Sequence, residues 1–250
     1  MKKLGSIVIL FSLAGCGGAS NVQQASYNVN KIFADSAGVF TGTTETGERA
    51  VGISPGVVDV VNAANNSESE SIDIDIANFP VVDTYPQGVV RSGAISTGTF
   101  AANVTIFIDS TEAADLIYMG IPGQSNLLMA TVEDYTAPTG SYSYTGLFAA
   151  AGRTVSPLVE YGTFTMEADF SANSVSFNGQ TASYGLTGSA VLDANAGTFN
   201  SNTFRFEDAD YYYDASIYGL MGGSGATATS GVFHTNDQSV DYSGAFLGHR

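Results

Sequence analysis

Cysteine is nearly absent from this sequence: Cys16 is the single one among 250 residues. An intramolecular disulfide is therefore excluded, and a chain of this length can bury a sizeable core without one. A lone cysteine in an exported chain needs another explanation, which its position near the N-terminus supplies below.

Positive charge is scarce as well, since 8 lysines and arginines stand against 24 aspartates and glutamates. Lys2 and Lys3 lie in a segment that we expect to be removed, which leaves 6 basic residues and a formal charge of −18. Such a charge repels phosphates, so we expect no nucleic-acid partner. It favours cations or basic partners, and it also keeps a β-rich chain soluble.

Histidine is limited to His234 and His249, and the sequence has no P-loop or His-Glu-x-x-His motif. His249 lies next to the C-terminus. His234 follows a predicted strand into a turn, where it would need a serine or a carboxylate pair beside it to act as a base. We therefore expect a protein that is not an enzyme and that carries no cofactor.

No helix-length amphipathic segment stands out, and apolar residues instead alternate with polar ones. Glycine, asparagine, aspartate and proline interrupt this alternation every eight to twelve residues, approximately, which is typical of a β-sandwich or β-barrel. The fold class predicted from the pattern is therefore all-β.

The C-terminal part gives the clearest pattern, with eight predicted antiparallel strands at 142–150, 160–170, 174–180, 184–193, 197–206, 212–220, 226–233 and 240–248. Turn residues separate them, as in Ser171-Ala172-Asn173 and Asn236-Asp237. Eight strands can close into a barrel whose interior holds side chains or one small ligand, and closure removes exposed edges. We expect such an eight-stranded barrel over 139–250.

The region before the barrel is β-rich but less regular, with predicted strands at 37–43, 57–61, 71–77, 87–99, 100–108, 115–121 and 126–133. The polar segment 62–71 is predicted to be a loop, and Pro138-Thr139-Gly140 to be a boundary. We therefore expect a separate N-terminal domain over 31–138.

The N-terminus has the three parts of an export signal: Lys2 and Lys3, an apolar stretch too short to span a bilayer, and small residues before Cys16. Leu13-Ala14-Gly15-Cys16 resembles the lipobox of bacterial lipoproteins, in which the cysteine thiol receives a diacylglyceryl group. We expect a signal peptide over 1–15 and a lipidated flexible tether over 16–30. Gly17 after the cysteine implies, by the same resemblance, transfer to the outer membrane.

The segment from Glu207 to Asp214 contains the candidate binding residues. In a strand, Tyr211 and Tyr213 would share one face and Tyr212 would lie on the other, and exposed tyrosines are enriched in interfaces. The alternative for them is packing at the barrel lip. Four carboxylates, those of Glu207, Asp208, Asp210 and Asp214, could serve calcium, but the spacing of an EF-hand is absent, and a solvated acidic turn is the alternative. His234 is a further binding candidate, and haem ligation by it or by a tyrosine is a less favoured interpretation.

Three stretches of the C-terminal half resemble the C-terminal barrel of transferrin-binding protein B-like surface lipoproteins, a group that includes relatives of factor H-binding protein. They are the pair Tyr161–Phe170 and Ser174–Phe177, the stretch Ile217–Phe233 with its two glycine-containing strands, and the closing Ser243–Arg250. The chain departs from the family at Leu220-Met221, where the family has proline and an acidic residue, and it is too short for a two-lobed receptor. Transferrin binding is therefore not carried over.

The resemblance implies a handle-like β domain before the barrel and a surface lipoprotein that serves nutrient or iron capture. We expect an outer-membrane, surface-exposed protein that binds a protein or a small solute. A structural or protective envelope lipoprotein without a discrete ligand is the alternative. A membrane pore is disfavoured, because the predicted strands lack a continuous apolar face.

Overall fold

A computed structural model gives the fold, and every regular element that it describes is a β-strand. The described residues are 9–14, 22–30, 39–44, 48–53, 72–75, 79–96, 101–109, 114–120, 127–152, 159–237 and 242–250. Cys16, the predicted strand 57–61 and the predicted loop 62–71 lie outside them. Within these ranges, no residue belongs to a helix that is long and apolar enough to cross a bilayer.

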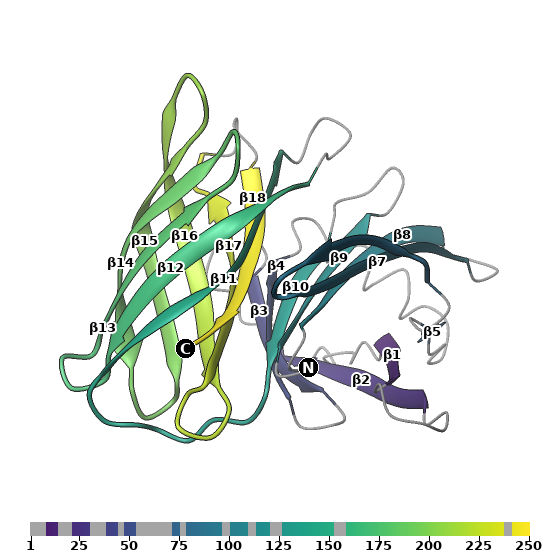
Figure 1. Ribbon diagram of the computed structural model, residues 1–250, viewed down its shortest axis with the longest axis horizontal. Helices are drawn as coiled ribbons and strands as arrows, with labels where there is room; N and C mark the ends of the chain where they lie inside the picture. Colours follow the sequence, from purple (N-terminus) through teal and green to yellow (C-terminus); the bar gives the residue numbers. More distant parts are fainter. Residues whose placement is uncertain are drawn as a thin grey trace, which may run out of the picture.

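The C-terminal half forms a closed barrel in which each strand pairs antiparallel with the next and β18 pairs back onto β11 (Figure 1). Its strands are β11 Ser141–Gly152, β12 Glu160–Asp169, β13 Ser174–Gln180, β14 Gly185–Asp193, β15 Thr198–Glu207, β16 Tyr212–Gly222, β17 Ala228–Thr235 and β18 Tyr242–His249. All eight strands expected from the sequence are confirmed, with bounds shifted by at most two residues.

The N-terminal half forms a ten-stranded sheet with the order β5-β1-β2-β3-β4-β10-β9-β8-β7-β6. The strands are β1 Ile9–Ala14, β2 Val22–Asn30, β3 Val39–Thr44, β4 Arg49–Ile53, β5 Ile72–Asp75, β6 Val81–Tyr85, β7 Gly88–Ser96, β8 Ala101–Asp109, β9 Ala114–Gly120 and β10 Leu127–Val132. Six of the seven strands expected here are confirmed, while β4 and β6 were not expected. Strands β1 and β2 fall within the expected signal peptide and tether, whose bounds stay a prediction.

The barrel interior is filled with phenylalanine rings that occupy the space left by inward-facing glycines. Phe177 lies at the centre, with ring centroids 5.0 Å from Phe164 and 4.8 Å from Phe246. A Cβ atom on Gly231 would lie 2.4 Å from the Phe246 ring, and one on Gly179 would lie 2.6 Å from Phe148. The recurrence of glycine beside phenylalanine in the sequence therefore reflects packing of large rings over residues without side chains.

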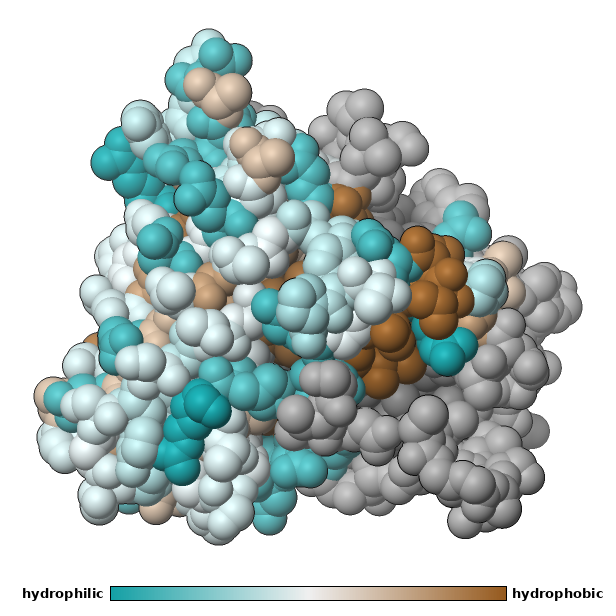
Figure 2. Space-filling model, in the orientation of Figure 1, coloured by the Kyte–Doolittle hydropathy of each residue, from teal (hydrophilic) through white to brown (hydrophobic). Residues whose placement is uncertain are grey.

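The sheet packs against one side of the barrel, which explains why the barrel strands differ in burial. Strand β13 alternates between exposed and buried residues, whereas every residue of β17 is buried. The outer face of β17 contributes Ala228 and Val232 to a second apolar cluster, shared with sheet residues such as Val51 and Phe107. Figure 2 shows hydrophobic side chains gathered between the barrel and the sheet.

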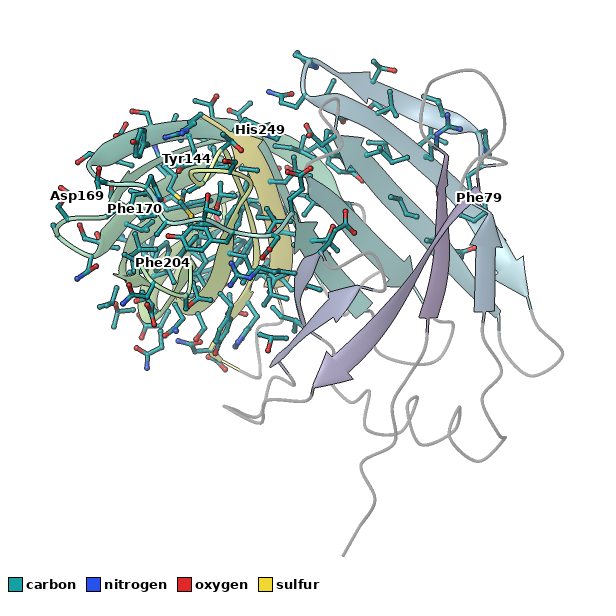
Figure 3. All side chains as sticks on the ribbon, turned by 90° about the horizontal axis from the view of Figure 1, so that it is seen from below. Phe79, Tyr144, Asp169, Phe170, Phe204 and His249 are labelled. Carbon is teal, nitrogen blue, oxygen red and sulfur yellow. The ribbon has the colours of Figure 1, made fainter. Side chains whose placement is uncertain are left out.

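Polar contacts also join the sheet to the barrel. The Arg49 guanidinium donates hydrogen bonds to the carbonyl oxygens of Ala196, Gly197 and Met221 at 2.7, 3.3 and 2.8 Å. His249 Nε2 lies 2.9 Å from the fully buried Asp109 carboxylate of β8. In Figure 3, Tyr144 and Phe204 lie within the barrel, and His249, the last residue of β18, lies at its side. The two halves thus share one continuous interface, and their division into separate domains stays a prediction.

Candidate functional site

Tyrosines gather at the end of the barrel where β15 turns into β16, which is the upper end in Figure 1 and opposite the C-terminus. We call this group the tyrosine rim, and its members are Tyr184, Tyr211, Tyr212, Tyr213 and Tyr242. Tyr211 and Tyr212 are 65% and 62% exposed, the largest aromatic exposures among the described residues. The rim is therefore an aromatic surface that faces solvent.

The rim rings follow one another from solvent down to the core. The ring centroids of Tyr211 and Tyr213 are 6.3 Å apart, and those of Tyr213 and Tyr242 are 5.8 Å apart. Tyr242 in turn lies 4.9 Å from Phe206, which is fully buried, and 5.4 Å from Tyr184. This series of ring contacts fixes the exposed Tyr211 on the packed interior.

Asp208 organises the turn that carries the rim. Its Oδ1 accepts hydrogen bonds from the backbone amides of Asp210 and Tyr211 at 2.9 and 2.8 Å. Its Oδ2 accepts hydrogen bonds from the hydroxyls of Tyr242 at 2.9 Å and Tyr213 at 3.3 Å. Burial disfavours the charged form of Asp208, but these hydrogen bonds outweigh it and lower its pKa.

Two turns at the other end of the barrel are also held by an aspartate that accepts hydrogen bonds from backbone amides. Asp169 Oδ1 accepts hydrogen bonds from Ser171 and Ala172, and Asp193 Oδ1 accepts them from Asn195 and Ala196. Aspartate side chains commonly cap turns in this way. What distinguishes Asp208 is therefore the second oxygen, which holds two tyrosine hydroxyls in place.

Glu160 fixes the neighbouring turn at the same end as the rim. Its carboxylate accepts hydrogen bonds from the Thr181 hydroxyl at 2.9 Å and from the Ser183 hydroxyl and amide at 2.8 and 3.0 Å. Burial disfavours the charged form here too, yet the hydrogen bonds from Ser183 and Thr181 lower its pKa. Tyr184 comes directly after Ser183 in the chain, so these hydrogen bonds also position the Tyr184 ring beside Tyr242.

Tyr212 lies on the opposite face from its two neighbours, as strand alternation requires. Its ring is covered by the Arg205 guanidinium, whose Cζ lies 3.4 Å from the ring centroid. Arg205 and Asp214 pair across β15 and β16. The structure therefore places Tyr211 and Tyr213 on one face and Tyr212 on the other, as expected from strand alternation.

His234 lies at the same barrel end as the rim, opposite Ser243 in the pairing of β17 with β18, but its ring is covered. It falls inside β17, where the sequence pattern had placed it after a strand, and it is 4% exposed. Its ring stacks on Tyr218 at 6.1 Å between centroids, and Nδ1 lies 3.0 Å from the Thr235 carbonyl oxygen. Because the ring is covered, we leave His234 out of the candidate surface.

The four carboxylates suggested as metal ligands do not converge. Across the part of the chain that the structure describes, no three histidine, cysteine, aspartate or glutamate side chains are placed to hold an ion together. Both oxygens of Asp208 accept hydrogen bonds from the protein, and Asp210 and Asp214 are exposed. Glu207, Asp208, Asp210 and Asp214 thus form an acidic turn, which is the alternative that the sequence left open.

Sequence reasoning found three rim tyrosines and missed two, Tyr184 and Tyr242. Each of these two comes from a different turn at the same barrel end, 58 residues apart in the chain. The signal was present in the strand order, because every second turn of an antiparallel barrel meets at one end. Local composition around either residue carries no such signal.

Two tyrosine hydroxyls with raised pKa values lead us to expect that the protein loses stability at alkaline pH. Burial, together with the Asp208 hydrogen bond and charge, raises the pKa of Tyr242, and burial with the nearby Asp83 carboxylate raises the pKa of Tyr161 to about 12. The unfolded chain therefore loses phenol protons near pH 10.0 while the folded protein keeps them. We expect full stability from this source below that pH and a progressive loss as pH rises toward 12.

Denaturant unfolding measured at a series of alkaline pH values checks this expectation. The Tyr161→Phe variant should lose stability less steeply with pH than the parent protein, since phenylalanine cannot ionise. Equal slopes for the parent protein and Tyr161→Phe would contradict the assignment.

Comparison with known proteins bears on the fold. No protein-family model matches the sequence, and no curated protein matches it. Three solved structures of transferrin-binding protein B do match the fold. They are a double mutant from Haemophilus parasuis Hp5, the intact two-lobed Ap-TbpB, and isotype 1 from serogroup B Neisseria meningitidis. The Haemophilus parasuis protein matches with TM-score 0.54 and 15% identity, over 93% of this chain and 46% of that one.

The intact protein matches with TM-score 0.50 and 12% identity, over 90% of this chain and 61% of that one. The meningococcal protein matches with TM-score 0.50 and 10% identity, over 93% and 54%. The chain thus spans about half of the proteins whose fold it shares. The resemblance expected from the barrel sequence is confirmed at the level of architecture: this chain has the transferrin-binding protein B-like fold.

Proposed function

We propose that this chain is a lipid-anchored protein of the bacterial outer surface that captures an iron-carrying protein through its tyrosine rim. The observation that carries the proposal is the pair of exposed tyrosines, Tyr211 and Tyr212, held at one end of a barrel with this fold. The matched structures are by name transferrin-binding proteins, which supports capture of an iron carrier as the role.

A protein partner fits the geometry better than a small solute. Rings such as Phe177, Phe204 and Phe246 fill the barrel, so a solute could enter only by displacing them. The rim offers instead exposed aromatic rings on a turn that Asp208 holds in place. Tyrosine provides large contact area with little loss of side-chain entropy, and for this reason it is enriched at protein interfaces.

The anchor is part of the proposal and rests on the sequence. Cys16 follows an apolar signal and small residues, and diacylglyceryl attachment to its thiol would provide stable membrane binding. Gly17 favours forwarding to the outer membrane. We propose binding without catalysis, because His234, the candidate base in the sequence, is buried against Tyr218.

Capture by intact cells tests the proposal. Cells that display the full-length chain are incubated with labelled iron-loaded transferrin, lactoferrin or haemoglobin, and bound label is measured by flow cytometry. We expect at least one carrier to bind, and replacement of both Tyr211 and Tyr212 by serine to weaken binding roughly tenfold or more. Val191→Ser is the matched control, since Val191 is 75% exposed on the distant part of β14.

Two outcomes would contradict the proposal. Binding of none of these carriers would favour the structural or protective envelope role instead. Binding that the rim variant leaves unchanged would move the contact surface elsewhere on the molecule. The anchor is checked in the same cells, because Cys16→Ser should shift both the protein and its binding capacity from the membrane fraction to the soluble fraction.

A further inference from the structure

We infer that the tyrosine rim receives arginine or lysine side chains of its partner, with the outer ring of Tyr211 as the face on which a cation stacks. The inference rests on the proposed function, whose contact surface it specifies chemically. It joins three independent features of the rim: the ring that faces solvent, the sign of the surrounding charge, and the rigidity of the support.

The exposed ring is the first feature. Tyr211 is 65% exposed, and within the described residues its ring contact is with Tyr213, at 47° between planes, which leaves most of its surface to solvent. The chain already stacks guanidinium groups on tyrosines of this barrel. Arg205 Cζ lies 3.4 Å from the Tyr212 ring and Arg250 Cζ lies 3.9 Å from the Tyr142 ring. A cation over a tyrosine face is attracted by the electron-rich ring.

The charge around this ring is the second feature. Asp208 and Asp210 lie within the same turn, and Glu207 and Asp214 flank it on β15 and β16. Arg205 is the basic residue of the hairpin formed by β15 and β16, and its guanidinium already lies over the Tyr212 ring. The whole chain carries 24 acidic and 8 basic residues. This field attracts ammonium and guanidinium groups and repels phosphates and carboxylates.

Rigid support is the third feature. The Tyr213 and Tyr242 hydroxyls are held by Asp208 Oδ2, while Oδ1 fixes the backbone amide of Tyr211 itself at 2.8 Å. The turn is thus ordered before any partner arrives, so less conformational entropy is lost on binding. Asp208 acts as a positioning residue, whereas the carboxylate of Asp210 is exposed and accessible to an incoming cation.

A peptide titration tests the inference independently of any natural partner. The full-length protein in non-ionic detergent is titrated into fluorescent tetra-arginine, with tetraglutamine and tetraglutamate as matched probes, and binding is followed by anisotropy. We expect tetra-arginine to bind more tightly than both other peptides, and its binding to weaken as salt is raised.

The variants separate ring from charge. Tyr211→Leu and Asp210→Asn should each weaken tetra-arginine binding about three- to tenfold, while Tyr211→Phe should preserve it because the ring remains. Glu167→Gln, on the exposed face of β12, removes the same unit of charge outside the rim and should have little effect. Equal binding of all three peptides, or equal losses with Glu167→Gln and Asp210→Asn, would overturn the inference.

Failure of this inference and failure of the proposed function give different results. If cells capture an iron carrier without any dependence on salt or on Asp210, the function stands and the cation-accepting role does not. If tetra-arginine binds at the rim but cells capture no carrier, the rim accepts cations and the iron-capture role is wrong.

Discussion

Replacement of Phe246 by alanine is expected to lower the free energy of unfolding by about 3–5 kcal/mol, because a large ring is lost from the centre of the barrel. The ring is fully buried on β18 and contacts Phe164, Phe177 and Phe199 at 5.4, 4.8 and 6.2 Å between centroids. Its removal leaves a cavity that rigid neighbouring strands cannot fill. Urea unfolding followed by circular dichroism measures the loss.

An exposed aromatic residue provides the comparison for this core change. Tyr212→Ala removes a ring of similar size that is 62% exposed, and surface changes of this kind usually cost about 0.5 kcal/mol or less. A Phe246→Ala variant as stable as Tyr212→Ala would mean that the interior is not packed as described. The same reasoning predicts that Gly231→Ala is destabilising, because its new Cβ would meet the Phe246 ring.

Replacement of Arg49 by methionine is expected to destabilise the junction of sheet and barrel by on the order of 2–3 kcal/mol. The Arg49 guanidinium satisfies three carbonyl oxygens of the barrel, at Ala196, Gly197 and Met221, and methionine keeps the apolar stem without the donors. Burial lowers the pKa of Arg49, as expected for a group enclosed by both halves of the molecule. Denaturant unfolding and limited proteolysis of the segment 133–140 report the effect.

Arg205→Met serves as the control, because Arg205 is exposed on the outer barrel face. That variant should leave both unfolding and protease sensitivity nearly unchanged. If Arg49→Met is equally harmless, the hydrogen bonds of Arg49 do not stabilise the junction. The apolar contacts, such as those of Val51 and Leu247, and the pair of His249 with Asp109 would then hold the interface.

The barrel could be predicted from the sequence because its signals are local. Strands such as β13 face water on one side, so their residues alternate, and Asp169 and Asp193 mark the turns. Strand β4 gives no such alternation, because four of its five residues are buried. Strand β6 is short, has exposed Val81 and Val82, and ends next to a proline, so its pattern is that of a loop.

The rim could be predicted only in part. Consecutive tyrosines at 211–213 are visible in the sequence, and alternation correctly separates Tyr212 from the other two. Tyr242 joins them because β18 begins at the barrel end where the β15–β16 turn lies. The role of Asp208 as the acceptor for two hydroxyls depends on that long-range approach. Residues far apart in the chain meet at the rim because the strands close into a barrel, and no local sequence pattern predicts this.

Hydrogen exchange with and without a captured partner tests the central claim most directly, since it locates the contact surface on the intact protein. If the rim is the binding surface, amides in 181–184 and 208–214 should become protected when an iron carrier is bound. The turns at the opposite end, 170–173 and 194–197, should exchange at unchanged rates. Protection confined to those opposite turns, or to the sheet, would contradict the account.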